Sequence, residues 1–525
     1  MNVKPPFVRF FRHCPHGHSR RTLLLAFTLT ILGMPFTPAF SPPLVNHLLS
    51  EDTLTIDIEC TQTSGTITPY AEINCGPLPI HYVKDGADLT EQYRNLGISC
   101  VRTHDFYGPT DVSEIFPRWN ADPSLASSYN FTRSDRCITG IINAGCEVFY
   151  RLGESASDDP ALREPPENFS KWAEICKHII MHYNDGWNNG YHYNISYWEI
   201  WNEPDLSGFW NSTADEYYRL YHITATTLKE YNESLKIGGP CTSSIDNENF
   251  TEGFLRYVKT HNLPLDFFSW HLYADTPHDF FTASQKVRTM LDSYGFTECE
   301  NINTEWNINI LTPQRDKDNA RNAAFTACAL TVFQDAAIDH AFRYRGTQDN
   351  NWLERLLGFD LGLFAYDGTY KTPALSYLAM HYMARDSPIR LATPPMDASK
   401  GITYLAGIAE DKANITVLIT NFESEDTTCT LTITNLPWNG SYRAVHYLID
   451  DRHHLEITGN ETSSSNYTAT FMLKRNTVQF IRLTNATSIP DEGPPVAPIP
   501  FLLRLRILDP FTRMLGILLL MLIFG

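Results

Sequence analysis

The chain has 525 residues, of which 43% are hydrophobic and 19% are charged, and its 41 basic and 60 acidic side chains give a formal net charge of −19 at pH 7. This apolar content is enough for a large core and excludes a globally disordered chain. The acidic balance argues against nucleic-acid binding, which needs a basic face, and mildly disfavours a polyanionic substrate. At about 100–200 residues per domain, the length predicts two to four domains, or fewer if one is a large barrel.

Residues 1–40 have the pattern of a targeting segment. Arginines up to Arg21 precede a nearly uncharged run from Thr22 to Phe36, and small residues follow up to Ala39. This order predicts a secretory signal peptide, with an uncleaved signal anchor as the alternative.

Eleven Asn-x-Ser/Thr sequons are in keeping with export. They begin at Asn130, Asn168, Asn194, Asn211, Asn232, Asn249, Asn414, Asn439, Asn460, Asn466 and Asn485. We therefore expect a secreted or extracellular glycoprotein, provided that the source glycosylates such sites. The eleven cysteines show no CxxC pair and no metal-ligand spacing. Most are interpreted as small buried hydrophobic residues, and one or two disulfides are left open.

Residues 487–525 are predicted to be a Pro-rich linker followed by a hydrophobic tail. The uncharged stretch from Met514 to Gly525 is 12 residues long, short of the ~20 residues of a spanning helix. It is interpreted as a candidate membrane anchor or sorting tail, and an amphipathic or merely apolar tail is the alternative. Membrane attachment is thus expected, if at all, through one of the two terminal hydrophobic segments.

Between residues 66 and 385, eight short apolar runs alternate with helical patterns. Helical spacing is clearest from Phe169 to Tyr183, and Thr213 with Glu216 forms a capping-box pattern. Eight strand–helix units predict the α/β class and a (β/α)8 TIM barrel over 66–385. A doubly wound open sheet is the competitor, disfavoured because the first strand is followed by no Gly-rich phosphate loop. The eight runs are Thr66–Ile73, Ile98–His104, Cys146–Leu152, Ser196–Trp201, Lys236–Gly239, Asp266–His271, Asn301–Trp306 and His340–Tyr344.

From residue 386 to 486, short strand runs separated by turn residues predict a C-terminal all-β sandwich domain. Asn439-Gly440 is a strong turn signal within it. Residues 41–65 form an N-terminal segment, in which the TLTIDI run, Thr53–Ile58, is a candidate further strand of the sandwich. The runs after the barrel are Ile402–Ile408, Ile415–Thr420, Cys429–Ile433, Tyr442–Leu448 and Phe471–Leu483.

The fourth predicted strand of the barrel ends in a carboxyl group among aromatic side chains. It reads Tyr197-Trp198-Glu199-Ile200-Trp201-Asn202-Glu203-Pro204-Asp205. Strand alternation is expected to break at Glu203-Pro204, because proline ends the hydrogen-bonded ladder. Asn202 and Glu203 are thereby placed at the strand mouth. Desolvation there raises the pKa of a carboxyl group, which suits a general acid.

The seventh predicted strand, Asn301-Ile302-Asn303-Thr304-Glu305-Trp306, delivers a second carboxylate at another strand mouth. Strands four and seven lie on opposite sides of an eight-stranded ring, so Glu203 and Glu305 are expected to face each other. Glycoside hydrolysis needs such a pair, one to protonate the leaving oxygen and one to attack or to activate water. The alternative to a catalytic role is that each glutamate is a solvent-exposed charged residue in a loop. The two-carboxylate reaction needs no metal or other cofactor, and none is expected.

The two motifs, Trp201-Asn202-Glu203-Pro204 and Thr304-Glu305-Trp306, resemble those of clan A glycoside hydrolases. Within that clan the chain is most similar to glycoside hydrolase family 39, the β-xylosidase and α-L-iduronidase family, over about residues 66–385. The further motifs of this resemblance are Gly76-Pro77-Leu78-Pro79, Val101-Arg102-Thr103-His104, Ser269-Trp270-His271-Leu272-Tyr273, Gly362-Leu363-Phe364 and Lys371-Thr372-Pro373.

The resemblance implies a retaining, double-displacement mechanism with Glu203 as acid/base and Glu305 as nucleophile. It also implies that Asn202 hydrogen-bonds the sugar 2-hydroxyl. His271 and Tyr273 would line the sugar subsite, with Tyr273 close to Glu305.

The eighth strand departs from the family pattern. It reads Ala341-Phe342-Arg343-Tyr344-Arg345-Gly346, where a tryptophan-rich end that packs under the sugar is expected. Tyr344 or Trp352 would have to take that place, which leaves the sugar specificity open.

Further candidates end other strands. His104-Asp105-Phe106 is expected to bind sugar hydroxyls, unless His104 is a core-facing histidine held by a backbone carbonyl. Glu154, after the third strand, is a site candidate, with an ion pair as the main alternative. His453-His454 in the β domain is interpreted as a surface loop.

The sequence thus predicts an exported glycosidase acting on an oligosaccharide or glycoside, most simply a β-xylosidase-like exo-enzyme. A uronidase is the alternative within the enzyme class, and Arg343, Arg345 or Arg151 would contact its sugar carboxylate. A non-catalytic carbohydrate-binding surface protein on the same fold is the alternative from another class.

Overall fold

The computed structural model describes residues 53–79, 86–104, 108–155, 162–346 and 358–485. Several predictions fall outside the described residues: the signal segment (1–40), the linker and tail (487–525), Asp105, Phe106 and Trp352. Among the described residues, no helix combines the length and the apolar character that crossing a membrane requires.

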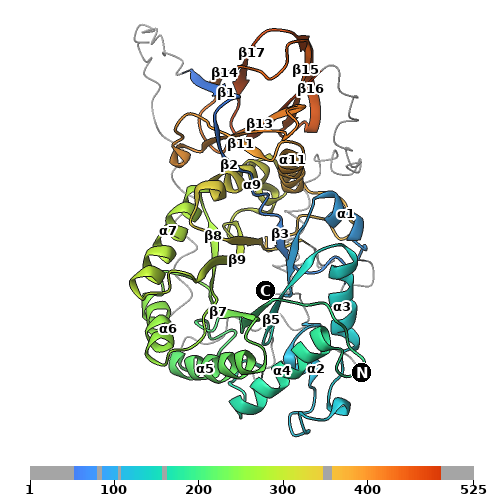
Figure 1. Cartoon of the computed structure of the whole chain (residues 1–525), viewed down its shortest axis with the longest axis vertical. Coiled ribbons are helices and arrows are strands. Elements are labelled where there is room, and N and C mark those ends of the chain that lie inside the picture. The colour runs from blue at the N-terminus through green and yellow to red at the C-terminus, as the bar shows by residue number, and fades with distance from the viewer. Residues whose placement is uncertain (1–52, 80–85, 105–107, 156–161, 347–357, 486–525) are drawn as a thin grey trace, which may run out of the picture. The chain divides into compact units, whose positions relative to one another are not determined.

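Eight parallel strands form a closed barrel, in which each strand pairs with the next along the chain and β10 closes the ring on β3 (Figure 1). The predicted (β/α)8 barrel is confirmed, and an open doubly wound sheet is excluded, because the ring has no edge strand. Each predicted strand run overlaps one barrel strand. The strands are β3 (Glu72–Asn74), β4 (Cys100–Arg102), β5 (Glu147–Leu152), β6 (Tyr197–Ile200), β7 (Lys236–Thr242), β8 (Phe267–Ala274), β9 (Glu300–Ile308) and β10 (His340–Arg343).

Helices surround this ring on the outside (Figure 1). On the fourth of them, the predicted apolar face is buried, including Trp172, Ile179 and Tyr183. The predicted cap at Thr213 also forms, since its side chain accepts a hydrogen bond from the Glu216 N–H. The helices are α1 (Thr90–Asn95), α2 (Val112–Ile115), α3 (Thr132–Asn143), α4 (Phe169–Asp185), α5 (Ala214–Tyr231), α6 (Glu248–Thr260), α7 (His278–Ser293), α8 (Gln314–Lys317), α9 (Ala320–Val332) and α11 (Thr372–Asp386), with the short 3-10 turns η1 (Ala126–Ser128) and η3 (Phe333–Asp335).

A cluster of apolar side chains fills the barrel interior on the side away from the C-terminal ends of the strands. It consists of Phe149, Phe267, Ile302 and Phe342 from four different strands. Cys100 on β4 and Tyr197 on β6 pack against this cluster, and two residues further along these two strands the side chains point into the barrel again. At that level β4 and β6 carry the charged residues Arg102 and Glu199, both fully buried. The interior therefore changes from apolar to charged toward the C-terminal ends of the strands, where such barrels hold their active sites.

The remaining strands form two sheets that enclose a second apolar cluster. One sheet has the order β1-β14-β17, and the other has the order β16-β15-β18-β13-β12-β11-β2. The TLTIDI run forms β1, which pairs in parallel with β14. The strands are β1 (Leu54–Glu59), β2 (Thr63–Thr66), β11 (Ile389–Leu391), β12 (Ile402–Ile408), β13 (Asn414–Asn421), β14 (Thr427–Thr434), β15 (Tyr442–Ile449), β16 (His454–Ser463), β17 (Tyr467–Leu473) and β18 (Thr477–Asn485), with the short turn η4 (Ala398–Lys400).

Several details of this β region differ from the prediction, which included neither β2 nor β11. The run Phe471–Leu483 is not one strand, because the chain turns at Asn476, whose φ of 57° is left-handed, and splits the run between β17 and β18. Strand β16 was not predicted: it is a largely exposed edge strand, so it carries little of the apolar alternation that marks a strand in a sequence.

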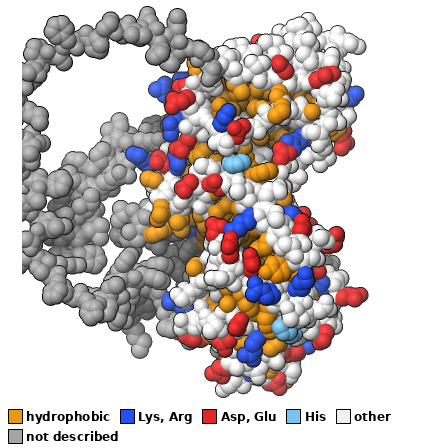
Figure 2. All heavy atoms as spheres, turned by 90° about the vertical axis from the view of Figure 1, so that its left-hand side faces the viewer, with side chains coloured by type: hydrophobic (Ala, Val, Ile, Leu, Met, Phe, Trp, Pro, Cys, Tyr) orange, Lys and Arg blue, Asp and Glu red, His pale blue; other side chains and the backbone are white. Residues whose placement is uncertain are grey.

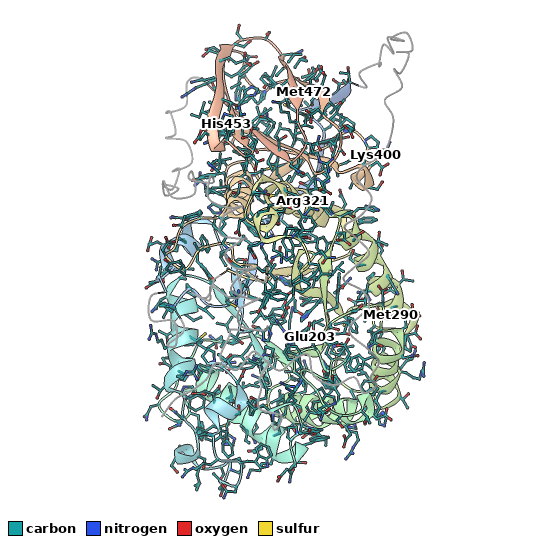
Figure 3. All side chains as sticks on the ribbon, turned by 180° about the vertical axis from the view of Figure 1, so that it is seen from behind. Glu203, Met290, Arg321, Lys400, His453 and Met472 are labelled. Atoms are coloured by element: carbon teal, nitrogen blue, oxygen red, sulfur yellow. The ribbon has the colours of Figure 1, made fainter. Side chains whose placement is uncertain are left out.

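Helix α9 carries side chains that contact the β sandwich. The rings of Phe325 and Phe422 lie 5.4 Å apart, edge to face. Arg321, labelled in Figure 3, pairs with Glu423 at 2.7 Å and stacks on Phe422. On the face shown in Figure 2, acidic and basic side chains are interspersed among exposed apolar ones.

Candidate active site

Glu203 and Glu305 meet at the mouth of the barrel, as the sequence predicted. Glu203 follows β6 by three residues and lies within the barrel part of the molecule (Figure 3), while Glu305 belongs to β9. A carboxylate oxygen of each lies within 4.8 Å of the other. Both side chains are mostly buried, with 14% of Glu203 and 6% of Glu305 exposed.

The end of β6 bends earlier than predicted. The strand ends at Ile200, and left-handed φ angles follow at Trp201 (75°) and Glu203 (44°). Strand alternation is therefore lost before Pro204, and the backbone N–H of Glu203 donates to the carbonyl of Cys241 on β7 at 2.9 Å. Non-glycine residues rarely adopt such angles, so the surrounding structure must hold them in place.

Glu203 lies in an environment that favours its protonated form. Burial, with a further contribution from the negative charge of Asp205, raises its pKa to about 8, although Arg102 acts in the opposite direction. Its Oε1 lies 2.8 Å from Nδ1 of His271. Burial lowers the pKa of His271, so this imidazole is neutral near pH 7 and gives Glu203 no full positive charge. A proton is thus available on Glu203 at neutral pH.

Glu305 has partners that favour its ionised form. Its Oε1 accepts a hydrogen bond from Arg102 at 3.0 Å, and its Oε2 accepts one from the phenol of Tyr273 at 2.7 Å. Burial raises the pKa of Glu305, while the positive charge of Arg102 and the hydrogen bond from Tyr273 oppose that rise. A guanidinium and a phenol that both donate to one carboxylate stabilise its negative charge. The two glutamates therefore have different chemical environments although they are close in space.

Arg102 connects the groups of this site from the centre of the barrel. It donates from Nε to Glu199 at 2.7 Å and from Nη1 to Asn74 and Glu305 at 2.9 and 3.0 Å. Its Nη2 donates to Oδ1 of Asn202 at 2.8 Å. These carboxylates raise the pKa of Arg102 against the effect of its complete burial. Arg102 is part of a motif named in the sequence analysis, but no role in the site was predicted for it. Its charge within an otherwise apolar strand could have indicated such a role.

The other predicted site residues gather around the two glutamates. Asn202 is fully buried, and its Nδ2 has no hydrogen-bond partner among the described residues. His104 lies with Nε2 at 3.6 Å from Oε1 of Glu305. The ring of Tyr344 lies 6.1 Å from that of His104 and 6.4 Å from that of Tyr273, and a cis peptide bond joins Tyr344 to Arg345.

Cys241 is a site residue that sequence reasoning missed. Its Sγ lies 3.1 Å from Nε2 of His271, accepts a hydrogen bond from Arg102 at 3.0 Å, and lies 3.4 Å from Oδ1 of Asn202. The described part of the chain contains ten cysteines, and most of them are buried. Nothing in the sequence separated Cys241 from these other buried thiols.

Glu154 belongs to a separate hydrogen-bonded group after β5. It accepts hydrogen bonds from the N–H and hydroxyl of Ser113, at 2.9 and 2.5 Å. Burial, with the nearby charge of Asp111, raises its pKa to about 8. The ion pair of this group joins Asp111 to Arg151 at 2.7 Å instead. In the β region, His453 pairs with Asp450 within one turn, at 2.9 Å.

Only one cluster in the described part of the chain has the composition of a metal site, and it is Glu203, His271 and Glu305 themselves. Two carboxylates and an imidazole are suitable ligands for a transition metal. The same three groups form the acid/base arrangement described above.

A (β/α)8 barrel that holds two close carboxyl groups at its mouth, one of which accepts hydrogen bonds from an arginine and a tyrosine, resembles the site of a glycoside hydrolase. Comparison with known proteins agrees: residues 54–350 match the model of glycosyl hydrolases family 39. The chain belongs to this family.

Two curated relatives are named β-xylosidases. That of Geobacillus stearothermophilus is 25% identical over 267 residues, which are 45% of this chain and 52% of the relative. That of Caldicellulosiruptor saccharolyticus is 28% identical over 212 residues, which are 37% of this chain and 40% of the relative. The matched segment therefore spans about half of these relatives or less.

Solved structures match a larger part of the chain. A glucosidase from Croceicoccus marinus is 27% identical with a TM-score of 0.74, over 83% of this chain and all of that one. A monomeric β-xylosidase from Caulobacter crescentus is 16% identical with a TM-score of 0.65, again over 83% of this chain and all of that one. The second likeness concerns the fold alone.

Proposed function

We propose that this glycosidase is a retaining enzyme, with Glu305 as nucleophile and Glu203 as acid/base. The observation that carries the proposal is the closeness of the two carboxyl groups, with oxygens within 4.8 Å of each other. Retaining glycosidases hold their carboxyl groups about 5–5.5 Å apart, whereas inverting enzymes need about 6.5–9.5 Å to leave room for a water molecule. The short distance between the oxygens is compatible with the retaining spacing.

In the first step, Glu305 attacks the anomeric carbon and Glu203 gives its proton to the leaving glycosidic oxygen. A covalent glycosyl–enzyme forms and the aglycone departs. In the second step, Glu203, now ionised, takes a proton from water, which attacks the same carbon and releases Glu305. The raised pKa of Glu203 supports its role as acid, and the hydrogen bonds from Arg102 and Tyr273 support Glu305 as the anion.

The sugar would bind over the two glutamates. The Nδ2 of Asn202, which lacks a partner among the described residues, is the expected donor to the 2-hydroxyl. His271 and Tyr273 would line the subsite, and the rings of His104 and Tyr344 would contact the sugar from the side of β4 and β10.

For the sugar itself we propose a β-linked pentoside such as a xyloside, released from a chain end. The naming of both curated relatives as β-xylosidases supports this substrate. A glucoside is the second candidate, favoured by the 27% identity to a structure named a glucosidase.

A uronidase stays the alternative within the enzyme class. Two of its three candidate cations have partners within the protein, since Arg151 pairs with Asp111 and Arg343 donates to Thr326 and Asn307. The Nε and Nη1 atoms of Arg151 nevertheless have no partner among the described residues. The third, Arg345, is buried, with 1% of its surface exposed.

A panel of 4-nitrophenyl and 4-methylumbelliferyl glycosides tests the proposal. We expect turnover of the β-xyloside, and proton NMR of the first product should show β-xylose before it mutarotates. First release of the α-anomer would mean inversion and would refute the double displacement. Preference for the β-glucoside or the α-L-iduronide would replace the proposed sugar while leaving the mechanism in place.

We also propose that the chain enters the secretory pathway and is glycosylated. Nine of its eleven sequon asparagines are exposed, and the other two, Asn414 and Asn485, are half-buried. Exposure is what the transfer of a glycan requires. Expression of the full chain in a glycosylating host, followed by digestion with an amidase that removes N-glycans, should lower the mass by several glycans. An unchanged mass would contradict this proposal.

A further inference from the structure

Cys241 is held in an unusual conformation next to the acid/base glutamate. Its φ of 55° is left-handed, as are those of Trp201 and Glu203. The N–H of Cys241 donates to the hydroxyl of Ser269 at 3.0 Å, and its carbonyl accepts from the N–H of Glu203 at 2.9 Å. A left-handed non-glycine residue persists only where its surroundings hold it, and such residues cluster at functional sites.

The thiol of Cys241 begins a short chain of contacts that leads to the acid. Its Sγ lies 3.1 Å from Nε2 of His271, and the other ring nitrogen, Nδ1, lies 2.8 Å from Oε1 of Glu203. The Sγ also accepts a hydrogen bond from Nη2 of Arg102 at 3.0 Å. All four side chains are buried or nearly so.

The protonation states limit how hydrogen can be arranged along this chain. Burial keeps the thiol protonated by raising its pKa, and it keeps His271 neutral by lowering its pKa. A neutral imidazole has one N–H and one acceptor nitrogen. Two arrangements are therefore available between Cys241 and Glu203.

In the first arrangement, the thiol donates S–H to Nε2, and Nδ1–H donates to Oε1 of Glu203. The carboxylic proton then resides on Oε2, where it is available to a glycosidic oxygen. In the second arrangement, Nε2–H donates to Sγ, and Nδ1 accepts the proton of Glu203. That proton is then held in the hydrogen bond to His271 and is not available to a glycosidic oxygen. The thiol proton has two acceptors within reach, Nε2 of His271 at 3.1 Å and Oδ1 of Asn202 at 3.4 Å. Oδ1 already accepts a hydrogen bond from Arg102 at 2.8 Å, so the shorter contact to Nε2 favours the first arrangement.

We propose that Cys241 is a positioning residue whose thiol holds His271 as the Nδ1–H tautomer, so that the acidic proton of Glu203 stays on the oxygen that His271 does not bind. This inference rests on the proposed role of Glu203 as the general acid. It assigns the thiol no contact with substrate, and its effect should follow the demand of the leaving group for a proton.

The test compares Cys241→Ala, which removes the S–H donor, with Cys241→Ser, which supplies an O–H donor. Cys176→Ala is the matched control, because Cys176 is also fully buried but lies on α4. Each variant is assayed for kcat/KM on two glycosides of the sugar that the wild type prefers. One carries 2,4-dinitrophenol, which needs little protonation, and the other carries an alkyl alcohol, which needs it fully.

For Cys241→Ala we expect a loss of about 10-fold on the alkyl glycoside and less than about threefold on the dinitrophenyl glycoside, because one positioning hydrogen bond is lost. Cys241→Ser should recover most of the alkyl activity, and Cys176→Ala should retain both. Equal losses on the two substrates, no loss on either, or a folded Cys241→Ser that behaves like Cys241→Ala would overturn the proposal.

Two further measurements keep the result interpretable. Glu203→Gln is assayed in parallel: if it shows no dependence on the leaving group, the proposed role of Glu203 fails, whereas a dependence there without one in Cys241→Ala refutes only the role of Cys241. Nitrogen-15 NMR of histidine-labelled wild type, with His271 assigned by His271→Asn, reads the tautomer even if Cys241→Ala fails to fold. A proton on Nε2 would sink the inference.

Discussion

The phenol of Tyr273 donates a 2.7 Å hydrogen bond to Oε2 of Glu305, which holds the proposed nucleophile between a phenol and the guanidinium of Arg102. This bond favours the ionised carboxylate, so Tyr273→Phe should raise the pKa of Glu305. We expect kcat/KM to fall by about 10-fold and its acidic limb to move to higher pH, because a charge-assisted hydrogen bond contributes roughly 1.5–3 kcal/mol. Tyr221→Phe is the control, since it removes a buried phenol that donates to the carbonyl of Pro264 instead.

The alkaline limb of the pH profile should report Glu203. As the proposed acid, Glu203 must be protonated in the free enzyme, and its pKa is raised to about 8, so kcat/KM should fall as pH rises through this value. Asp205, whose carboxylate accepts hydrogen bonds from the N–H and hydroxyl of Ser243, contributes to the raised pKa. Asp205→Asn removes that charge and should move the limb to lower pH. A limb that does not move would exclude the contribution of Asp205.

Removal of each glutamate should have a different consequence. Glu305→Ala removes the proposed nucleophile, so no covalent intermediate should form and turnover of every substrate should be lost. Glu203→Ala removes proton transfer, worth roughly 100- to 10,000-fold where the leaving group needs it, and a dinitrophenyl glycoside should still form the intermediate.

Azide should then rescue the two variants with opposite stereochemistry. On a β-glycoside, Glu203→Ala should give the β-glycosyl azide through two inversions, and Glu305→Ala the α-glycosyl azide through one. Proton NMR of the products distinguishes them. The same anomer from both variants would show that the roles of Glu203 and Glu305 are assigned wrongly.

Glu154 should make the protein less stable as the pH rises. Its folded-state pKa of about 8 lies above that of a glutamate in an unfolded chain, so the folded protein binds this proton more tightly. The resulting stabilisation is fully present below about pH 4 and is lost as the pH rises through about 8. Glu154→Gln should therefore melt like the wild type near pH 5 and be more stable at pH 9 by about 1–3 kcal/mol. Glu147→Gln, an exposed change on the same strand, is the control and should melt like the wild type at both values.

Much of the barrel and both glutamates were predictable from the sequence, because their signals are local. The eight strands follow from short apolar runs whose neighbours have helical spacing, and a strand mouth follows from the position of Pro204. Glu203 and Glu305 each stand in a motif of a few residues at a strand end. Since strand order in such a barrel follows chain order, placing two glutamates on strands four and seven also placed them across one mouth.

The tertiary structure decided which other side chains complete the site. Arg102 and Glu305 are 203 residues apart in the chain, and their contact depends on the register of strands that close into a ring. The turns at Trp201 and Cys241 have left-handed angles that no local sequence preference predicts, because these residues adopt them only under the constraint of the surrounding packing. The sequence by itself therefore determined the fold class and the pair of glutamates proposed to react. The hydrogen bonds and charged neighbours of that pair were determined only by the closed barrel, because they depend on contacts between strands that are distant in sequence.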